Sequence, residues 1–166
     1  MVTHDQEEAL AIADRIFVMD SGKIMQFGTP EDIYANSRNP FVANFIGMTN
    51  FIEGKVLNKN VIEIDNKQLD FIGHGFSKGT KVLVAARPEC IQLSEKSGKN
   101  IFDGTVVDVE FLGSFLRIYL QTSIMPNQRL IVDKPMIGDF DKSTAVGDVL
   151  GFTMSPTYLN VYECDK

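Results

Sequence analysis

The sequence changes character at Gly47. Before this position, signals that start helices follow one another at short intervals. After it they stop, and short segments rich in β-branched and aromatic residues alternate with polar turn clusters. These clusters include residues 58–60, 65–67 and 97–100. Such alternation is typical of a small antiparallel β-barrel or sandwich. The sequence therefore predicts an α/β part over residues 1–47 and a mainly β part over residues 48–166.

Three helix start signals lie in the first part. Asp5 is a candidate N-cap, with Glu8 three residues later in the pattern of a capping box. Thr29 and Asn39 each precede a proline, which suits the first position of a helix. Between the first signal and the others lie two apolar segments joined by a Ser-Gly turn, which predict a β-hairpin. These segments are residues 15–19 and 23–27.

The β part contains a repeated pattern. Residues 50–56 resemble residues 100–106, and two later segments each have a glycine nine positions before a proline. The glycine–proline pairs are Gly79 with Pro88 and Gly147 with Pro156. Because both matches occur in the same order along the chain, we predict two similar OB-like antiparallel barrels over residues 50–95 and 100–163.

Composition narrows the possible functions. The net charge of -6 argues against a nucleic-acid partner, which usually requires a basic face. The cysteines and histidines have no metal-ligand spacing, so we expect no bound metal and a reducing compartment. They are Cys90, Cys164, His4 and His74. No apolar run approaches the ~20 residues that span a bilayer, so we expect no direct membrane insertion.

Residues 2–10 carry the most specific motif, Val-Thr-His-Asp-Gln-Glu-Glu-Ala-Leu. It brings His4 from the end of an apolar strand to the start of a capped helix. Strand ends and helix N-termini are where α/β folds bind phosphates, and an imidazole there can contact a terminal phosphate or an attacking water. The alternative is a histidine that only caps or packs. His4 is therefore a candidate catalytic residue.

Four consecutive segments resemble the end of the ATPase domain of ABC transporters. They are residues 2–10, 13–24, 26–34 and 39–47. The resemblance implies that His4 is the switch histidine, which contacts the γ-phosphate of ATP in that family. No G-x-x-x-x-G-K-[ST] phosphate loop, magnesium-binding Asp-Glu strand end or L-S-G-G-Q-type signature occurs in the sequence. Because phosphoryl transfer needs these parts together, we expect no ATPase activity here, with ATP and magnesium as cofactors only of an intact parent.

Residues 85–89, Ala-Ala-Arg-Pro-Glu, are the candidate site of the β part. Pro88 holds the residue before it extended, and on a strand Arg87 and Glu89 would point to the same side. They form a structural ion pair, or they are solvated charges at a strand end, or the guanidinium makes an oxyanion or inter-subunit contact. The segment resembles the R-P-E motif of TOBE domains, the OB-like modules that follow many importer ATPases. Residues 109–114 resemble the V-E-x-L-G-S turn of the same domains.

This resemblance implies regulation and subunit pairing. In the family, two ATPase subunits close around ATP while their C-terminal domains stay in contact. The expected partners are a second copy of the chain and the transmembrane permease subunits, at the cytoplasmic face of the cell membrane. The resemblance is to the importer branch for ferric iron, polyamines, sulfate or phosphonates, and residues 45–51 and 111–115 favour iron or phosphonate. The alternative function is a TOBE module that binds an oxyanion or another small ligand.

For two sets of apolar residues the question is whether they pack in a core or stay exposed. In an OB-like barrel, exposed phenylalanines can stack on nucleobases, but at β spacing in an acidic chain they are expected to form core. This set is Phe71, Phe76, Phe111 and Phe115. The second set lies in the α/β part, where the family's packing partners are missing, and is expected to pack elsewhere or stay partly exposed. It is Leu10, Ile12, Ile16, Phe41 and Phe45.

Overall fold

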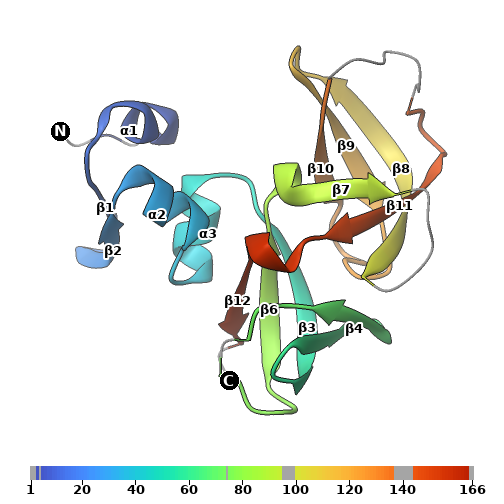
Figure 1. Cartoon of the computed structure of the whole chain (residues 1–166). Helices are drawn as coiled ribbons and strands as arrows, with labels where there is room; N and C mark the ends of the chain where they lie inside the picture. Colours follow the sequence, from blue (N-terminus) through green and yellow to red (C-terminus); the bar gives the residue numbers. More distant parts are fainter. Residues whose placement is uncertain (1–2, 4, 74, 95–99, 137–143, 165–166) are drawn as a thin grey trace. The chain divides into compact units, whose positions relative to one another are not determined.

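The computed structural model describes residues 3, 5–73, 75–94, 100–136 and 144–164 (Figure 1). Contacts within the chain divide it into two compact units, Met1–Thr49 and Asn50–Lys166. We call them unit 1 and unit 2. Across the described residues, none of the helices has the length and apolar character needed to span a membrane.

Unit 1 has a helix, a β-hairpin and two further short helices, in the order that the start signals predict. Its elements are α1 (Gln6–Ile12), β1 (Ile16–Asp20), β2 (Lys23–Gly28), α2 (Pro30–Ala35) and α3 (Pro40–Ile46). The hairpin turns at Ser21 and Gly22, which both have positive φ angles. A small core of Ile16, Val18, Ile33, Val42 and Ile46 joins the hairpin to α2 and α3.

All three predicted N-caps are confirmed. Asp5, Thr29 and Asn39 each accept a hydrogen bond from the backbone amide three residues later, at 3.0, 3.3 and 2.9 Å. The capping box is wrong in one respect, because the Asp5 N–H donates to Thr3 Oγ1 at 3.0 Å and not to the Glu8 side chain. Helices of six or seven residues depend on such caps, since most of their backbone groups have no partner within the helix.

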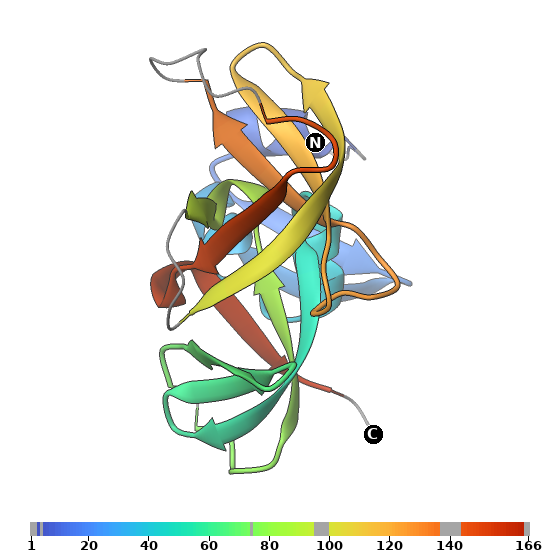
Figure 2. The same ribbon diagram turned by 90° about the vertical axis from the view of Figure 1, so that its right-hand side faces the viewer.

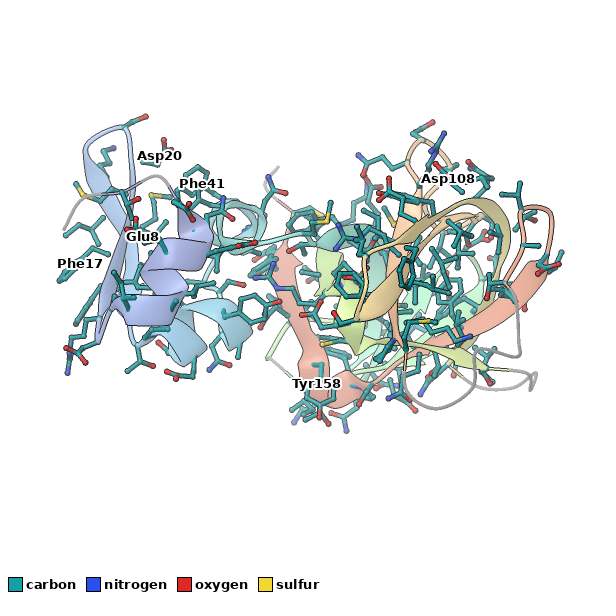
Figure 3. All side chains as sticks on the ribbon, turned by 90° about the horizontal axis from the view of Figure 1, so that it is seen from above. Glu8, Phe17, Asp20, Phe41, Asp108 and Tyr158 are labelled. Atoms are coloured by element: carbon teal, nitrogen blue, oxygen red, sulfur yellow. The ribbon has the colours of Figure 1, made fainter. Side chains whose placement is uncertain are left out.

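The outer face of the hairpin in unit 1 is apolar and exposed. Phe17 and Phe27 face each other across β1 and β2, with ring centroids 5.1 Å apart, and Phe17 is 57% exposed (Figure 3). Met19 and Ile24 continue this face and are also exposed. The apolar residues of the α/β part that were expected to lack their packing partners divide into two groups. Ile16 is buried and Leu10 packs on the core, whereas Ile12, Phe41 and Phe45 are exposed.

Unit 2 consists of two five-stranded antiparallel sheets, with strand orders β5-β4-β3-β6-β12 and β10-β9-β8-β11-β7. The mainly β, OB-like fold class is therefore confirmed. The strands are β3 (Asn50–Asn58), β4 (Val61–Ile64), β5 (Lys67–Asp70), β6 (Lys81–Ala86), β7 (Ile91–Ser94), β8 (Ile101–Phe111), β9 (Phe115–Gln121), β10 (Leu130–Pro135), β11 (Val149–Met154) and β12 (Leu159–Glu163). Two 3₁₀ turns, η1 (Pro88–Cys90) and η2 (Pro156–Tyr158), precede β7 and β12.

The two sheets follow one plan and exchange their last strands (Figures 1 and 2). After η1 the chain crosses to the second sheet, where β7 pairs with β11. After η2 it crosses back, and β12 pairs with β6. The registers are equivalent, because Ile91 opposite Met154 in one sheet corresponds to Leu159 opposite Ala86 in the other. This exchange ties the two sheets into one body.

A single hydrophobic core fills unit 2 and draws on both sheets. Phe102 and Phe152, directly opposite each other on β8 and β11, stack at its centre with ring centroids 5.9 Å apart. Phe71 is buried in the core, Phe76 packs partly against it, and Phe115 is half-buried. The prediction is wrong for Phe111, which is 65% exposed, because it lies at the end of the long strand β8.

Candidate functional site

The candidate catalytic residue, His4, lies outside the described residues. Its neighbour Asp5 is the N-cap of α1, and the Asp5 N–H donates to Thr3 Oγ1. The switch-histidine role of His4 therefore stays a prediction.

The second predicted site, Arg87 with Glu89, has a different local geometry from the one expected. Strand β6 ends at Ala86, and Pro88 starts the 3₁₀ turn η1, so Glu89 is not on a strand and the same-side argument is wrong. The physical reason is the fixed φ of proline, which suits the first position of a helical turn. Arg87 is only 7% exposed, while Glu89 is exposed. Arg87 is therefore largely covered within one chain.

Cys90 closes the same turn, and its backbone N–H donates to the Arg87 carbonyl at 3.0 Å. Burial raises the pKa of the Cys90 thiol, and the Glu89 carboxylate raises it further, while the Arg87 guanidinium lowers it. A thiol whose pKa is raised is a weaker nucleophile at neutral pH. Cys90 therefore has the properties of a structural residue.

Asn50, at the start of β3, joins the two sheets. Its side-chain amide donates to the carbonyls of Ile131 at 2.9 Å and Ala86 at 3.2 Å, and the Ile131 N–H donates to Asn50 Oδ1 at 2.8 Å. Asn100 holds the equivalent position in the repeat, and its Oδ1 accepts from the Asp70 N–H at 2.9 Å. Asn50 therefore joins β3 to β10 of the second sheet, and Asn100, directly before β8, joins the second sheet to β5 of the first. The sequence repeat marks both residues, but it does not predict these contacts.

A charged ladder crosses β8, β9 and β10. Arg117 donates to both carboxylate oxygens of Asp133 at 2.8 Å, and the hydroxyl of Tyr119 donates to Glu110 at 3.1 Å. The hydrogen bond that Arg117 donates to Asp133 is the main cause that raises the pKa of Arg117. Both residues of the Arg117–Asp133 pair are largely covered, which makes this a structural ion pair rather than an open anion site.

A pocket of about 300 Å³ opens in unit 2. One wall is formed by β3 and the end of β4, and the other by the loop over residues 123–128 between β9 and β10. Phe51, Ile64 and Met125 provide apolar surface, and Glu53 and Asp65 provide carboxylates. No lysine or arginine lines it within the part of the chain that the structure describes. The pocket therefore favours a cation over an anion.

Sequence reasoning missed this pocket. Glu53 and Asp65 stand twelve positions apart, and the loop that covers them is more than fifty residues further along. One signal was available, because Asp65-Asn66 predicts a tight turn, and in the structure this turn ends β4 and leads into β5. Both residues have positive φ angles of 47° and 62°.

Three comparisons with known proteins bear on this arrangement. The sequence profile of the TOBE domain matches residues 84–159. The crystal structure of the cytoplasmic molybdate-binding protein ModG, with molybdate bound, has a similar fold, with a TM-score of 0.56 and 13% sequence identity. The similarity covers 68% of this chain and 94% of ModG, and at this identity it concerns the fold alone.

Curated relatives extend the similarity beyond unit 2. The spermidine/putrescine import ATP-binding protein PotA of Clostridium acetobutylicum is 35% identical over 165 residues, which are 99% of this chain and 44% of the relative. The protein of the same name in Clostridium novyi is 32% identical over 160 residues, 96% of this chain and 43% of the relative. The chain thus spans less than half the length of these relatives. Over nearly its whole length it is similar to the C-terminal portion of the ATP-binding subunits of ABC importers, and its β part contains a TOBE domain.

Proposed function

We propose that this chain is the regulatory and subunit-pairing portion of the ATP-binding subunit of an ABC importer, without ATPase activity of its own. The observation that carries the proposal is the extent of the similarity, which covers 99% of this chain but only 44% of the relative. The sequence contains no phosphate loop, so the parts that bind and hydrolyse ATP would belong to the remaining length. His4 would act on ATP only in such a parent.

The proposed partners are a second copy of the chain and the permease subunits of the importer, at the cytoplasmic face of the membrane. The proposed cargo is a polyamine, because the two relatives are named for the import of spermidine and putrescine. The iron or phosphonate preference in residues 45–51 and 111–115 gains no support from those names. We also propose that unit 2 arose by duplication, since the order and register of its two sheets are equivalent.

The oxyanion-binding alternative has weaker support. It rests on the fold of ModG, whose structure holds molybdate. The pocket of unit 2 is lined by carboxylates and by no basic side chain among the described residues, which disfavours an anion there. Arg87, the cation that the alternative requires, is largely covered.

Light scattering at tens of micromolar protein tests the pairing role. The proposal expects a two-fold dimer both for the whole chain and for a chain limited to residues 50–166, the unit with the larger core. A shortened chain that is monomeric, when the whole chain associates, would assign association to the exposed apolar face of unit 1 and refute pairing through unit 2.

Charge reversal then probes the interface. Glu89 is exposed and is the better first position, because Arg87→Glu would bury a carboxylate and disturb the fold itself. If η1 lies in the interface, Glu89→Arg is expected to weaken the dimer without lowering the free energy of unfolding of unit 2.

A further inference from the structure

We propose that unit 2 pairs with a second copy of the chain along the open edge of β8, through antiparallel backbone hydrogen bonds of Val109 and Phe111. This inference rests on the subunit-pairing role proposed above and names the surface that performs it. The two copies would be related by a two-fold axis at Glu110, so that the two β8 strands join their sheets into one.

The open edge exists because β8 is longer than the strand beside it. β11 pairs with β8 only as far as Thr105. The Val106 N–H then donates to the Asp148 carbonyl at 2.8 Å, and the Val106 carbonyl accepts from the Gly147 N–H at 2.9 Å. At Gly147 a φ angle of 99° turns the chain away from β8. β8 itself continues to Phe111 (Figures 1 and 2).

The first repeat has the same device but leaves almost no open edge. The Val56 N–H donates to the Thr80 carbonyl at 3.0 Å, and the Val56 carbonyl accepts from the Gly79 N–H at 2.8 Å. Gly79 also has a positive φ angle, of 90°. However, β3 ends close to this point, at Asn58. The open edge of β8 therefore comes from the longer hairpin of β8 and β9 and not from the plan that the two repeats share.

The backbone groups of Val109 and Phe111 face this edge. At the hairpin turn the Leu112 N–H donates to the Phe115 carbonyl at 3.0 Å. Residues that bond to the neighbouring strand alternate along an antiparallel pair, so Glu110 bonds to β9 and the residues on either side of it point away from β9. Among the residues that the structure describes, no strand pairs with this side of β8 beyond residue 106.

The open edge is flanked by exposed apolar side chains. Phe111 is 65% exposed and Leu112 is 45% exposed at one end, and Val146 is 66% exposed at the turn that begins the edge. The Val109 N–H donates at 2.9 Å to the carboxylate of its own neighbour, Asp108, a bond that another strand can replace. An open strand edge with apolar side chains is a template for pairing with a further strand.

A second copy fits this edge because two identical antiparallel strands are related by a two-fold axis. With the axis at Glu110, Val109 of each copy lies opposite Phe111 of the other, which allows about four hydrogen bonds. Leu112 of the second copy then lies opposite residue 108 and meets no occupied backbone. An axis at Val109 would bring Leu112 of the second copy opposite Val106, where the segment before β11 is already bonded. The open edge therefore has the length for one register.

Charge limits the strength of this pairing. At the axis the two Glu110 carboxylates would lie opposite each other, and like charges in that position repel. Within each copy Glu110 accepts from the Tyr119 hydroxyl at 3.1 Å and lies opposite Arg117 on β9, which offsets part of the repulsion. A short strand pair also buries less surface than a standard interface. We therefore expect weak self-association that becomes stronger when the charge of Glu110 is removed.

Sedimentation equilibrium of the whole chain from about 10 μM to about 1 mM measures this association. Phe111→Ala keeps the backbone donor, whereas Phe111→Pro removes it. Proline is tolerated where the N–H faces away from the neighbouring strand, and circular dichroism checks that both variants fold. The dimer should weaken about threefold in Phe111→Ala and about tenfold or more in Phe111→Pro, and Glu110→Gln should strengthen it about two- to fivefold. Ile72→Ala, at an exposed apolar residue beyond the end of β5, is the matched control and should leave it unchanged.

A disulfide tests the register. Directly opposite residues that do not share hydrogen bonds have Cα atoms about 4.5 Å apart, within the range that a disulfide spans. In a background of Cys90→Ala and Cys164→Ser, Glu110→Cys should therefore form a linked dimer when dissolved oxygen and copper phenanthroline are the oxidant. Glu163→Cys, at an exposed carboxylate of the first sheet, should not.

The inference is overturned if Phe111→Pro weakens the dimer no more than Phe111→Ala, because apolar contact alone would then explain the association. It is also overturned if Glu110→Gln does not strengthen the dimer, if Ile72→Ala weakens it as much as the Phe111 variants, or if Glu110→Cys forms no more linked dimer than Glu163→Cys. A chain that dimerises with any of these results refutes β8 as the interface and leaves the pairing role standing. A chain that is monomeric over the whole concentration range refutes the pairing role as well.

Discussion

Removal of the Asn50 side chain tests whether the two sheets of unit 2 depend on a polar contact as well as on their shared core. Asn50 is 2% exposed, and its amide satisfies both the N–H and the carbonyl of Ile131. In Asn50→Ala both backbone groups lose this partner. The Ala86 carbonyl loses one as well, but it lies within a strand pair and keeps that environment.

The magnitude follows from the two groups of Ile131. A buried polar group without a partner costs about 1–3 kcal/mol. Because Ile131 is half-buried, water can reach part of its backbone, and the lower end of this range applies. We therefore expect Asn50→Ala to lower the free energy of unfolding by about 2–3 kcal/mol, a large fraction of the total for a domain of this size. With an m-value of about 2 kcal/mol/M, the urea midpoint falls by about 1–1.5 M.

Urea unfolding followed by circular dichroism measures this change, and Asn100→Ala is the matched control. Asn100 makes the equivalent contact to Asp70, but it is half-buried, so its loss should cost about 0.5–1.5 kcal/mol. A loss below about 0.5 kcal/mol for Asn50→Ala at an unchanged m-value would refute the reasoning. So would a larger loss for Asn100→Ala than for Asn50→Ala.

Three further predictions concern the other parts of the chain. A thermal shift assay should find no stabilisation by micromolar ATP with magnesium, because the sequence has no phosphate loop; a clear shift would contradict this. In a proven monomer, hydrogen exchange should be faster over residues 5–20 than over residues 81–86, since unit 1 has the smaller core, and equal protection would be the contrary result. In a Cys164→Ser background, iodoacetamide should modify Cys90 more slowly than a free thiol, because burial raises the pKa of Cys90. The modification should reach its full rate at a higher pH than for a free thiol. The folded state is stabilised by the protonated thiol, and this stabilisation is lost as pH rises through the raised pKa.

Local features of the fold follow from local sequence. The N-caps at Asp5, Thr29 and Asn39 were predictable because a cap joins a side chain to an amide three residues away. The hairpin of unit 1 was predictable because its turn residues join the two strands directly. The Arg87–Glu89 geometry was wrong for a related reason. A proline ends strand pairing and also starts a helical turn, and the prediction took only the first effect into account.

Non-local features did not follow from the sequence in this way. The repeated pattern predicted two separate barrels, in which β7 would pair with the first set of strands and β12 with the second. In the structure β7 pairs with β11 and β12 pairs with β6. The apolar residues of β7 and β12 suit either sheet equally well, because the two sheets are built on the same register. The side on which each strand pairs is decided by the path of the chain through η1 and η2, and neither turn reveals it in its residue types.

The same exchange explains why the pocket of unit 2 could not be predicted from the sequence. The pocket combines β3 of the first set of strands with the loop between β9 and β10 of the second set, and these meet only because the two sets are tied together. Asn50 starts the strand that carries Glu53 and contacts Ile131, which follows the pocket loop after only a few residues. Loosening this contact should therefore change the pocket as well as the stability.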